Sequence, residues 1–531
     1  MNSHKNICSK IFAQHSAAEE YKCGIGRKGL FEQIKQNRRF YKGEQWYGAK
    51  TGADKPLVTN NVIRRIGDYK TAVVGGEKVQ VSFSPIGVSS ISLKEAEKRL
   101  KADVMSGNKR CFDKLSDEEL LLASKAISQY FNNCINRLHF DDICMSALKN
   151  AYITGTGIVY VYWDCNVKTG LFADDKRTVP IMGDICAEVI DIENVDFSDP
   201  ANSDIKDQEY IIVASRKPVG ELIREARKNG IKGEELENIK PDNEYCDSEA
   251  FYSEKATVLT KFYKEYKGDG DYTIKAIRVC KNAVIKPEWD TKLKVYPIAK
   301  FNWDNENCAY GESEITNIIP NQIAINRMLT ATVWSVMMMG MPIMLVNGDI
   351  ITEPITNSPG QIISFCGDSE DFERAIKYIA PPQLAGNVDE ITTKLIENTL
   401  NAAGATDAAL GTIKAQNTSA INAVKEMARL PLNSIKNRYI SFTEDIANIF
   451  LQFMLNMYGS RPIAQKTDEG DIWYFPFKSE RYRDLCFICE SSISEVSDDI
   501  GLIADELDNL DKQSKQQLAD VLIDPENKEA V

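Results

Sequence analysis

Six acidic residues gather in one stretch of this sequence, and clustered carboxylates are the groups that a two-metal nuclease uses to hold its ions. They are Asp191, Glu193, Asp196, Asp199, Asp204 and Asp207. The residues between them include Pro200, Asn202 and Ser203, which are typical of a solvated loop. We therefore expect exposed carboxylates here, with no metal site and no catalytic residue, and we keep a metal-dependent nuclease or hydrolase as an alternative function.

Other patterns that carry chemistry are missing from the sequence or incomplete. The phosphate-binding motif of P-loop ATPases does not occur, and no serine sits in a G-x-S-x-G turn. The chain has three histidines, His4, His15 and His139. His4 and His15 lie near Cys8 and Cys23, but the four spacings match no familiar zinc site. We expect no enzyme activity, no cofactor and no metal.

The balance of charge also limits the possible functions. The formal charge of the 531 residues is −13, which argues against a general nucleic-acid coat. Most of the excess lies at the C-terminus, where residues 490–531 hold twelve Asp or Glu and three Lys. The thirteen cysteines show no repeated spacing and no secretion signal is recognisable, so the sequence favours a reducing, cytoplasmic setting for assembly.

One uncharged stretch resembles the end of a membrane span. Residues 331–346 read ATVWSVMMMGMPIMLV. This is shorter than the roughly 18 to 20 apolar residues that a span needs, and Gly340 and Pro342 interrupt it. Membrane association through residues 331–346 stays an alternative function. The methionines could form an adaptable contact surface or pack in a core, and the sequence alone leaves both open.

The elements that would position these residues are of both kinds, so we expect an α+β fold. A basic amphipathic helix is predicted over residues 27–40, a second helix over 62–74 and a third after Ser116. Residues 155–300 alternate like β-strands, and long helical patterns follow from about 313. A helical pattern over 419–458 is broken only by Pro431, which should kink it, and two strands and an acidic tail complete the chain.

Four local patterns, taken in order, resemble the portal (head-to-tail connector) proteins of tailed bacteriophages over roughly residues 27–490. The first comprises Tyr41, Gly43, Gln45, Trp46, Asn60, Asn61 and Pro85, and the second is the Asp199-Pro200 turn. The third comprises Tyr310, Gly311, Ser313, Gln322 and Asn326, and the fourth is GATDAALGTIKAQNTSAINAVKEM. Each pattern is weak by itself, and their shared order carries the resemblance.

The resemblance implies a ring subunit, and each of its parts is assigned to a segment of the chain. The parts are an N-terminal arm over 1–26, a wing over 27–312, a first stem helix over 313–339, a clip over 340–384, a second stem helix over 385–403, a tunnel loop over 404–418, a long kinked helix with returning wing strands over 419–490, and an acidic crown over 491–531. The arm is expected to be loosely ordered.

The resemblance also implies site residues and partners. The tunnel loop would meet DNA through Asp407, Lys414, Gln416 and Asn417, and the stem would meet the neighbouring subunit through Gln322, Asn326, Met337, Met338 and Met339. The expected protein is a ring, usually of twelve subunits, at one vertex of the virion capsid. Its partners would be double-stranded DNA, the terminase large subunit, head-completion or adaptor proteins, and major capsid and scaffolding proteins, with no membrane. An acidic chain suits passing DNA that must not be gripped.

Overall fold

The fold is mixed α and β, in agreement with the α+β class expected from the sequence. The computed structural model describes residues 2–24, 29–49, 56–76, 79–85, 117–172, 178–242, 254–268, 271–304, 308–340, 343–347, 349, 351, 355, 362, 364, 376–379, 387–405, 430–466, 472–483 and 487–493. The chain divides into two compact units. Unit 1 comprises Met1–Gln33, Lys70–Ser313 and Leu432–Val531, and unit 2 comprises Ile34–Tyr69 and Glu314–Pro431.

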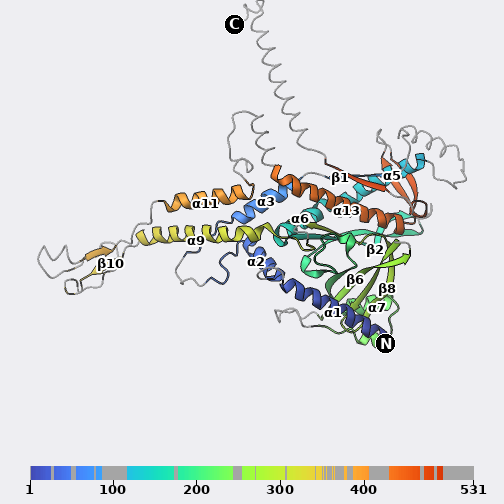
Figure 1. The fold of residues 1–531 in the computed structure, drawn as a ribbon, viewed down its shortest axis with the longest axis horizontal. Coiled ribbons are helices and arrows are strands. Elements are labelled where there is room, and N and C mark those ends of the chain that lie inside the picture. The colour runs from blue at the N-terminus through green and yellow to red at the C-terminus, as the bar shows by residue number, and fades with distance from the viewer. Residues whose placement is uncertain are drawn as a thin grey trace, which may run out of the picture. The chain divides into compact units, whose positions relative to one another are not determined.

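Unit 1 holds most of the strands (Figure 1). Its helices are α1 (Asn2–Gly24), α5 (Asp117–Leu138), α6 (Phe140–Thr154), α7 (Val219–Lys228), α8 (Glu234–Glu237), α13 (Asn433–Met457) and α14 (Ser479–Tyr482), with single turns η1 (Ile192–Asn194) and η2 (Ile205–Asp207). Its strands are β1 (Val79–Pro85), β2 (Thr156–Phe172), β3 (Pro180–Ile190), β4 (Val195–Phe197), β5 (Tyr210–Pro218), β6 (Lys255–Gly268), β7 (Asp271–Cys280), β8 (Val284–Leu293), β9 (Ile298–Asn302), β12 (Ser460–Lys466), β13 (Ile472–Lys478) and β14 (Phe487–Ile493).

These strands form antiparallel sheets, which confirms the β-rich prediction for residues 155–300. Five strands lie in the order β4-β5-β6-β7-β8 and three in the order β3-β2-β9, while β1 pairs with β14 and β12 with β13. The three-stranded sheet shows the alternation of side chains along β2. Val159 and Val161 are buried on one face, while Tyr160 and Tyr162 stack on the other, with ring centroids 5.3 Å apart.

Helix α13 supplies much of the core of unit 1. Its buried residues include Phe442, Ile446, Ile449, Phe450 and Phe453, at the alternating three- and four-residue spacing of a packed helix face. The ring of Phe450 meets Phe131 of α5 edge-on, with centroids 5.3 Å apart. The break expected at Pro431 is present as the single 3₁₀ turn η3 (Leu430–Leu432), after which α13 begins. Residues 419–429 of the predicted long helix lie outside the described residues.

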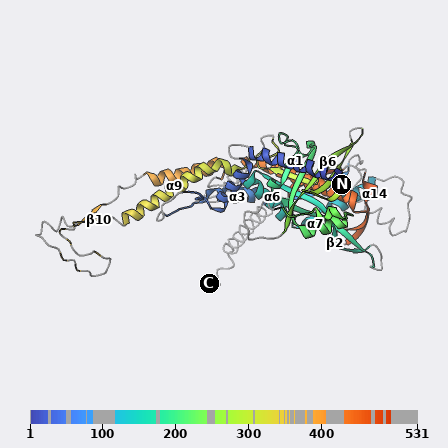
Figure 2. The same cartoon turned by 90° about the horizontal axis from the view of Figure 1, so that it is seen from below.

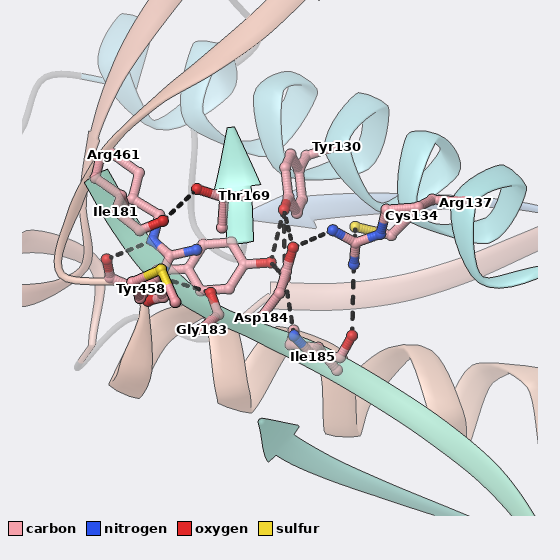
Figure 3. A network of polar contacts seen from close by, with 11 residues as sticks. Tyr130, Cys134, Arg137, Thr169, Ile181, Gly183, Asp184, Ile185, Tyr458 and Arg461 are labelled. Atoms are coloured by element: carbon pink, nitrogen blue, oxygen red, sulfur yellow. Dashed lines mark hydrogen bonds and ion pairs between the residues drawn. The ribbon is translucent and has the colours of Figure 1, made fainter. Parts of the chain in front are cut away.

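A buried carboxylate ties three parts of unit 1 together (Figure 3). Asp184 of β3 is 1% exposed and accepts hydrogen bonds from Tyr458, at 2.8 Å, and from Tyr130 of α5. Arg137 of α5 also pairs with Asp184. Burial, followed by the neighbouring Tyr130, raises the pKa of Tyr458 well above its usual value, so Tyr458 stays a hydrogen-bond donor at neutral pH.

Helix α1 packs on unit 1, which replaces the loosely ordered arm expected over residues 1–26. His15 lies 2.6 Å from one carboxylate oxygen of Asp196 in β4, and the Lys22 ammonium lies 2.7 Å from the other. Lys22 is fully buried and also donates to the carbonyl of Glu193 at 3.0 Å. Asp196 is only 1% exposed, so the prediction that the whole acidic stretch is solvated was wrong at this residue.

Unit 2 is mostly helical. It contains α9 (Glu314–Gly340), α11 (Val388–Ala402) and the short paired strands β10 (Ile343–Val346) and β11 (Ile376–Ile379). Most of α2 (Leu30–Lys42) and the first half of α3 (Val62–Gly75) also belong to it. The helices expected over 27–40, 62–74, 313–339 and 385–403 are thus present within a few residues, whereas their roles as wing and stem stay predictions.

Candidate assembly surface

Helices α9 and α11 form an antiparallel pair. The chain runs along α9 to the antiparallel strand pair β10–β11 and then returns along α11 in the opposite direction (Figures 1 and 2). The amide of Asn321, near the start of α9, donates to the hydroxyl of Thr399, near the end of α11, at 3.3 Å. This contact sets the direction of the pair and positions the surface described below.

The first half of α9 is anchored by a buried network of amide groups. Gln322 is fully buried and its carbonyl oxygen accepts from the backbone N–H groups of Val62 and Ile63, at 3.0 and 3.3 Å. The Gln322 amide nitrogen donates to the carbonyl of Asn60 and to the side-chain oxygen of Asn326, at 2.5 and 3.0 Å. Both ends of the Gln322 side chain are therefore satisfied, as burial requires.

Asn326 extends the same network to the loop after α2. Its side-chain nitrogen donates to Gln45 at 2.5 Å, and its oxygen accepts from the backbone N–H of Asn60 at 3.1 Å. Gln45 and Asn60 come from the first of the four patterns of the resemblance, and Gln322 and Asn326 from the third. Two sequence patterns separated by more than 250 residues thus meet in one network. The expected contact of Gln322 and Asn326 with a second subunit stays a prediction.

The second half of α9 has a different environment. None of the residues 327–339 is buried, and after Arg327 none of them is charged. The exposed fractions are 38% for Val333, 58% for Val336, 44% for Met337 and 39% for Met339. Met338 is half-buried. We call this part of the helix, residues 327–339, the apolar tip of α9.

The neighbouring helix α11, unlike the apolar tip, has several exposed charged residues. Its buried residues Thr392, Thr399 and Leu400 lie on one face. Asp389, Glu390, Lys394 and Glu397 are exposed, and Lys394 pairs with Glu390 at 2.6 Å one turn away. Helix α11 is therefore an ordinary amphipathic surface helix, whereas the tip of α9 has no charge after Arg327 and exposes Val333, Val336, Met337 and Met339.

A cluster of exposed large apolar side chains on an uncharged helix segment normally marks a contact with another protein or with a membrane. Among the helices that the structure describes, none has the length and apolar content needed to cross a bilayer. Methionine side chains adapt to irregular partner surfaces because they are unbranched and polarizable. The geometry of the apolar tip therefore suits a contact with another protein surface. It offers hydrophobic burial and contains no group that performs chemistry.

The remaining predicted site residues belong to the expected tunnel loop. Asp407, Lys414, Gln416 and Asn417 lie outside the described residues. Within the ranges described, no three His, Cys, Asp or Glu side chains are placed to hold a metal ion.

Unit 1 contains a cavity of about 540 Å³ beside Tyr160, Tyr162 and Arg278, which is large enough for a small ligand. Its lining includes Arg278, whose guanidinium is already engaged by Glu225 at 2.6 Å and by the hydroxyl of Thr260 at 3.0 Å. The lining residues include no histidine and no cysteine.

The comparisons with known proteins add no relative. No protein-family model matches the chain, and no curated protein sequence matches it.

Proposed function

We propose that this protein is the subunit of a portal-type ring, and that the apolar tip of α9 packs against a neighbouring copy. The observation that carries the proposal is that none of the thirteen consecutive residues 327–339 is buried, that the last twelve are uncharged, and that Val333, Val336, Met337 and Met339 are exposed. Leaving such a surface in water is unfavourable by roughly 25 cal/mol for each Å² of apolar area. A closed ring covers this surface in every copy, because the same patch is repeated by rotational symmetry.

Two further observations support the proposal. The order helix, hairpin, helix over residues 314–402 matches the order of stem, clip and stem that the resemblance implies. The first and third patterns of the resemblance also meet in the buried network of Gln322 and Asn326. In this proposal the ring, usually of twelve copies, sits at a capsid vertex of the virion and passes double-stranded DNA. Terminase, adaptor, capsid and scaffolding proteins are its partners.

The test is the mass of the purified full-length chain, measured by native mass spectrometry together with negative-stain images. We expect ring-shaped particles whose mass is a multiple of 59.6 kDa. The double substitution Val336→Glu and Met337→Glu should give monomers, because each copy would bring two charges into an apolar contact. Its circular dichroism spectrum should be nearly unchanged, because both side chains are exposed in the single chain.

The matched control places the same two charges on exposed apolar positions of unit 1. Met182 is 41% exposed and Tyr266 is 64% exposed, so Met182→Glu with Tyr266→Glu should leave the rings intact. A chain that stays monomeric at micromolar concentration would contradict the proposal. Rings that survive the substitutions at Val336 and Met337 would show that the tip is not the contact.

A further inference from the structure

Helix α2 carries four basic side chains on one face. Lys35, Arg38, Arg39 and Lys42 stand at positions i, i+3, i+4 and i+7, which places them along a single stripe of the helix. Lys35 and Lys42 are exposed, and neither has an ion-pair partner among the described residues. We call these four residues the basic stripe.

The other face of α2 is fixed against the rest of unit 2. Ile34 is 1% exposed, Asn37 is 2% exposed and Tyr41 is 8% exposed. The Asn37 amide donates to the hydroxyl of Thr316 in α9 at 3.1 Å, and the Tyr41 hydroxyl donates to Asp68 of α3 at 2.5 Å. These contacts hold α2 in one rotation about its axis, with Lys35 and Lys42 of the basic stripe exposed.

An exposed aromatic ring lies beside the stripe. The guanidinium of Arg39 sits 3.6 Å from the ring centroid of Tyr47, which is 71% exposed. This stacking keeps the guanidinium ordered and accessible. A guanidinium held in this way can bind a phosphate through two N–H donors.

The local charge differs in sign from that of the whole chain. Residues 34–69 hold eight Lys or Arg and three Asp or Glu, a formal charge of +5, in a chain whose total is −13. Asp68 is occupied by Tyr41 and by Arg64, the latter at 3.4 Å. Glu32 lies one turn before Lys35, and Glu44 follows the helix. The acidic neighbours are therefore too few to neutralise this segment.

We propose that the basic stripe of α2 binds the phosphate backbone of double-stranded DNA without reading its sequence. The seven steps from Lys35 to Lys42 span about 10 Å at 1.5 Å per residue, the length of about three phosphate spacings of one strand along the duplex axis. The charge of the stripe indicates a polyanion as its ligand. The identification of that polyanion as duplex DNA rests on the proposed function. Four phosphate contacts give reversible binding that salt weakens, which is compatible with DNA that moves.

The test is binding of the full-length chain to a fluorescent 30-base-pair duplex of arbitrary sequence, measured by anisotropy between 50 and 200 mM KCl. The test variant is Lys35→Gln, Arg39→Gln and Lys42→Gln. It should bind about tenfold or more weakly at 50 mM KCl, and the slope of log affinity against log salt should fall in magnitude by about 2 to 3, since each lost phosphate contact removes about 0.9.

A matched control removes three charges from unit 1. Lys232, Lys240 and Lys255 are exposed, and changing all three to Gln makes the same change in net charge. This control should keep at least half of the wild-type affinity and the wild-type salt slope. A second variant, Lys35→Gln with Lys42→Gln, leaves the contact between Arg39 and Tyr47 intact. It should show about two thirds of the change in salt slope that the triple variant shows.

Three results would overturn the inference. They are a wild-type chain that does not bind the duplex at 50 mM KCl, equal losses in the test variant and the control, and stripe-dependent binding to vesicles with anionic lipid but not to DNA. The mass of each sample is measured in parallel. Rings without stripe-dependent DNA binding would reject only this inference, whereas stripe-dependent binding by a chain that never forms rings would reject only the proposed function.

Discussion

The two units of this protein treat polar and apolar side chains in opposite ways. Unit 1 buries the charged residues Asp184, Asp196 and Lys22 and gives each of them partners from other elements of the same unit. In unit 2 the buried polar residues Gln322 and Asn326 are amides, and a few turns further on α9 exposes Val336. Most of the large apolar side chains that the described residues expose belong to unit 2, although it is the smaller unit.

The difference between the units indicates two sources of stability, which are contacts within one chain and contacts with another protein. A buried charge is tolerated only when its partners are built into the same fold, so unit 1 contains what it needs to be stable by itself. Exposed apolar surface gains its stabilisation only when something covers it, so unit 2 would gain from association. We therefore expect substitutions at the buried polar groups to act on folding and substitutions at the apolar tip to act on assembly.

The largest expected effect on folding is at Asp196. Asp196→Ala leaves the Lys22 ammonium and a buried His15 without their carboxylate, and breaking a buried pair in this way typically costs about 3 to 5 kcal/mol. The free energy of unfolding, measured with urea, should fall by that amount. The control Asp271→Ala removes an exposed carboxylate paired with Lys294 and should cost about 0.5 kcal/mol or less. Equal effects of the two substitutions would show that the buried ion pairs of unit 1 contribute no more to its stability than an exposed pair does.

The next effect concerns the one polar network of unit 2 described above. Gln322→Ala removes the acceptor that binds the backbone N–H groups of Val62 and Ile63 and the donor to the carbonyl of Asn60, which should cost about 1 to 3 kcal/mol locally. Hydrogen exchange at the amides of Val62 and Ile63 should become faster by about 30-fold or more. Asn317→Ala, at an exposed position of the same helix, is the control and should change these rates little. Unchanged exchange in Gln322→Ala would mean that the network does not hold α9.

The elements of the fold were largely predictable, because they rest on local patterns. The periodic spacing of apolar residues indicates which side of a single strand or helix is buried. This spacing is strand-like in residues 155–300 and helical in residues 313–339 and 433–457. Helix α1 was not predicted as a packed element. Its anchors are His15 and Lys22, whose partner Asp196 lies 181 and 174 residues away in the sequence. No short pattern reports a contact between residues so far apart.

The candidate site was predictable only in part for the same reason. The uncharged character of residues 331–339 could be read from the sequence, but its exposure depends on which elements pack on α9. Gln322 and Asn326 were singled out by resemblance alone, and their intramolecular partners Gln45 and Asn60 were not foreseen. Two polar residues four apart in an otherwise apolar helix are the signal that could have indicated a buried network.

The smallest effect tests whether the ion pairs of unit 1 respond to pH. Burial alone would lower the pKa of His15, but the hydrogen bond and the negative charge of Asp196, together with Glu19, outweigh burial and the opposing charge of Lys22, so the pKa is raised above 6.5. The folded state then holds the His15 proton more tightly than the unfolded state does. This contribution to stability is complete below about pH 6.5 and is lost as the pH rises through the folded-state pKa.

Comparison of the wild type with His15→Gln measures this contribution. The difference in their free energy of unfolding, followed with urea from pH 5.5 to 9, should be largest at the acidic end and shrink as the pH rises, because Asp196 then interacts with a neutral ring. His139→Asn is the matched control: His139 is exposed and its backbone is left-handed, with φ of 49°, which asparagine tolerates. The control should show a difference that does not change with pH. A His15→Gln difference that grows toward pH 9 would mean that His15 is buried in its neutral form, and Lys22 alone would then balance the charge of Asp196.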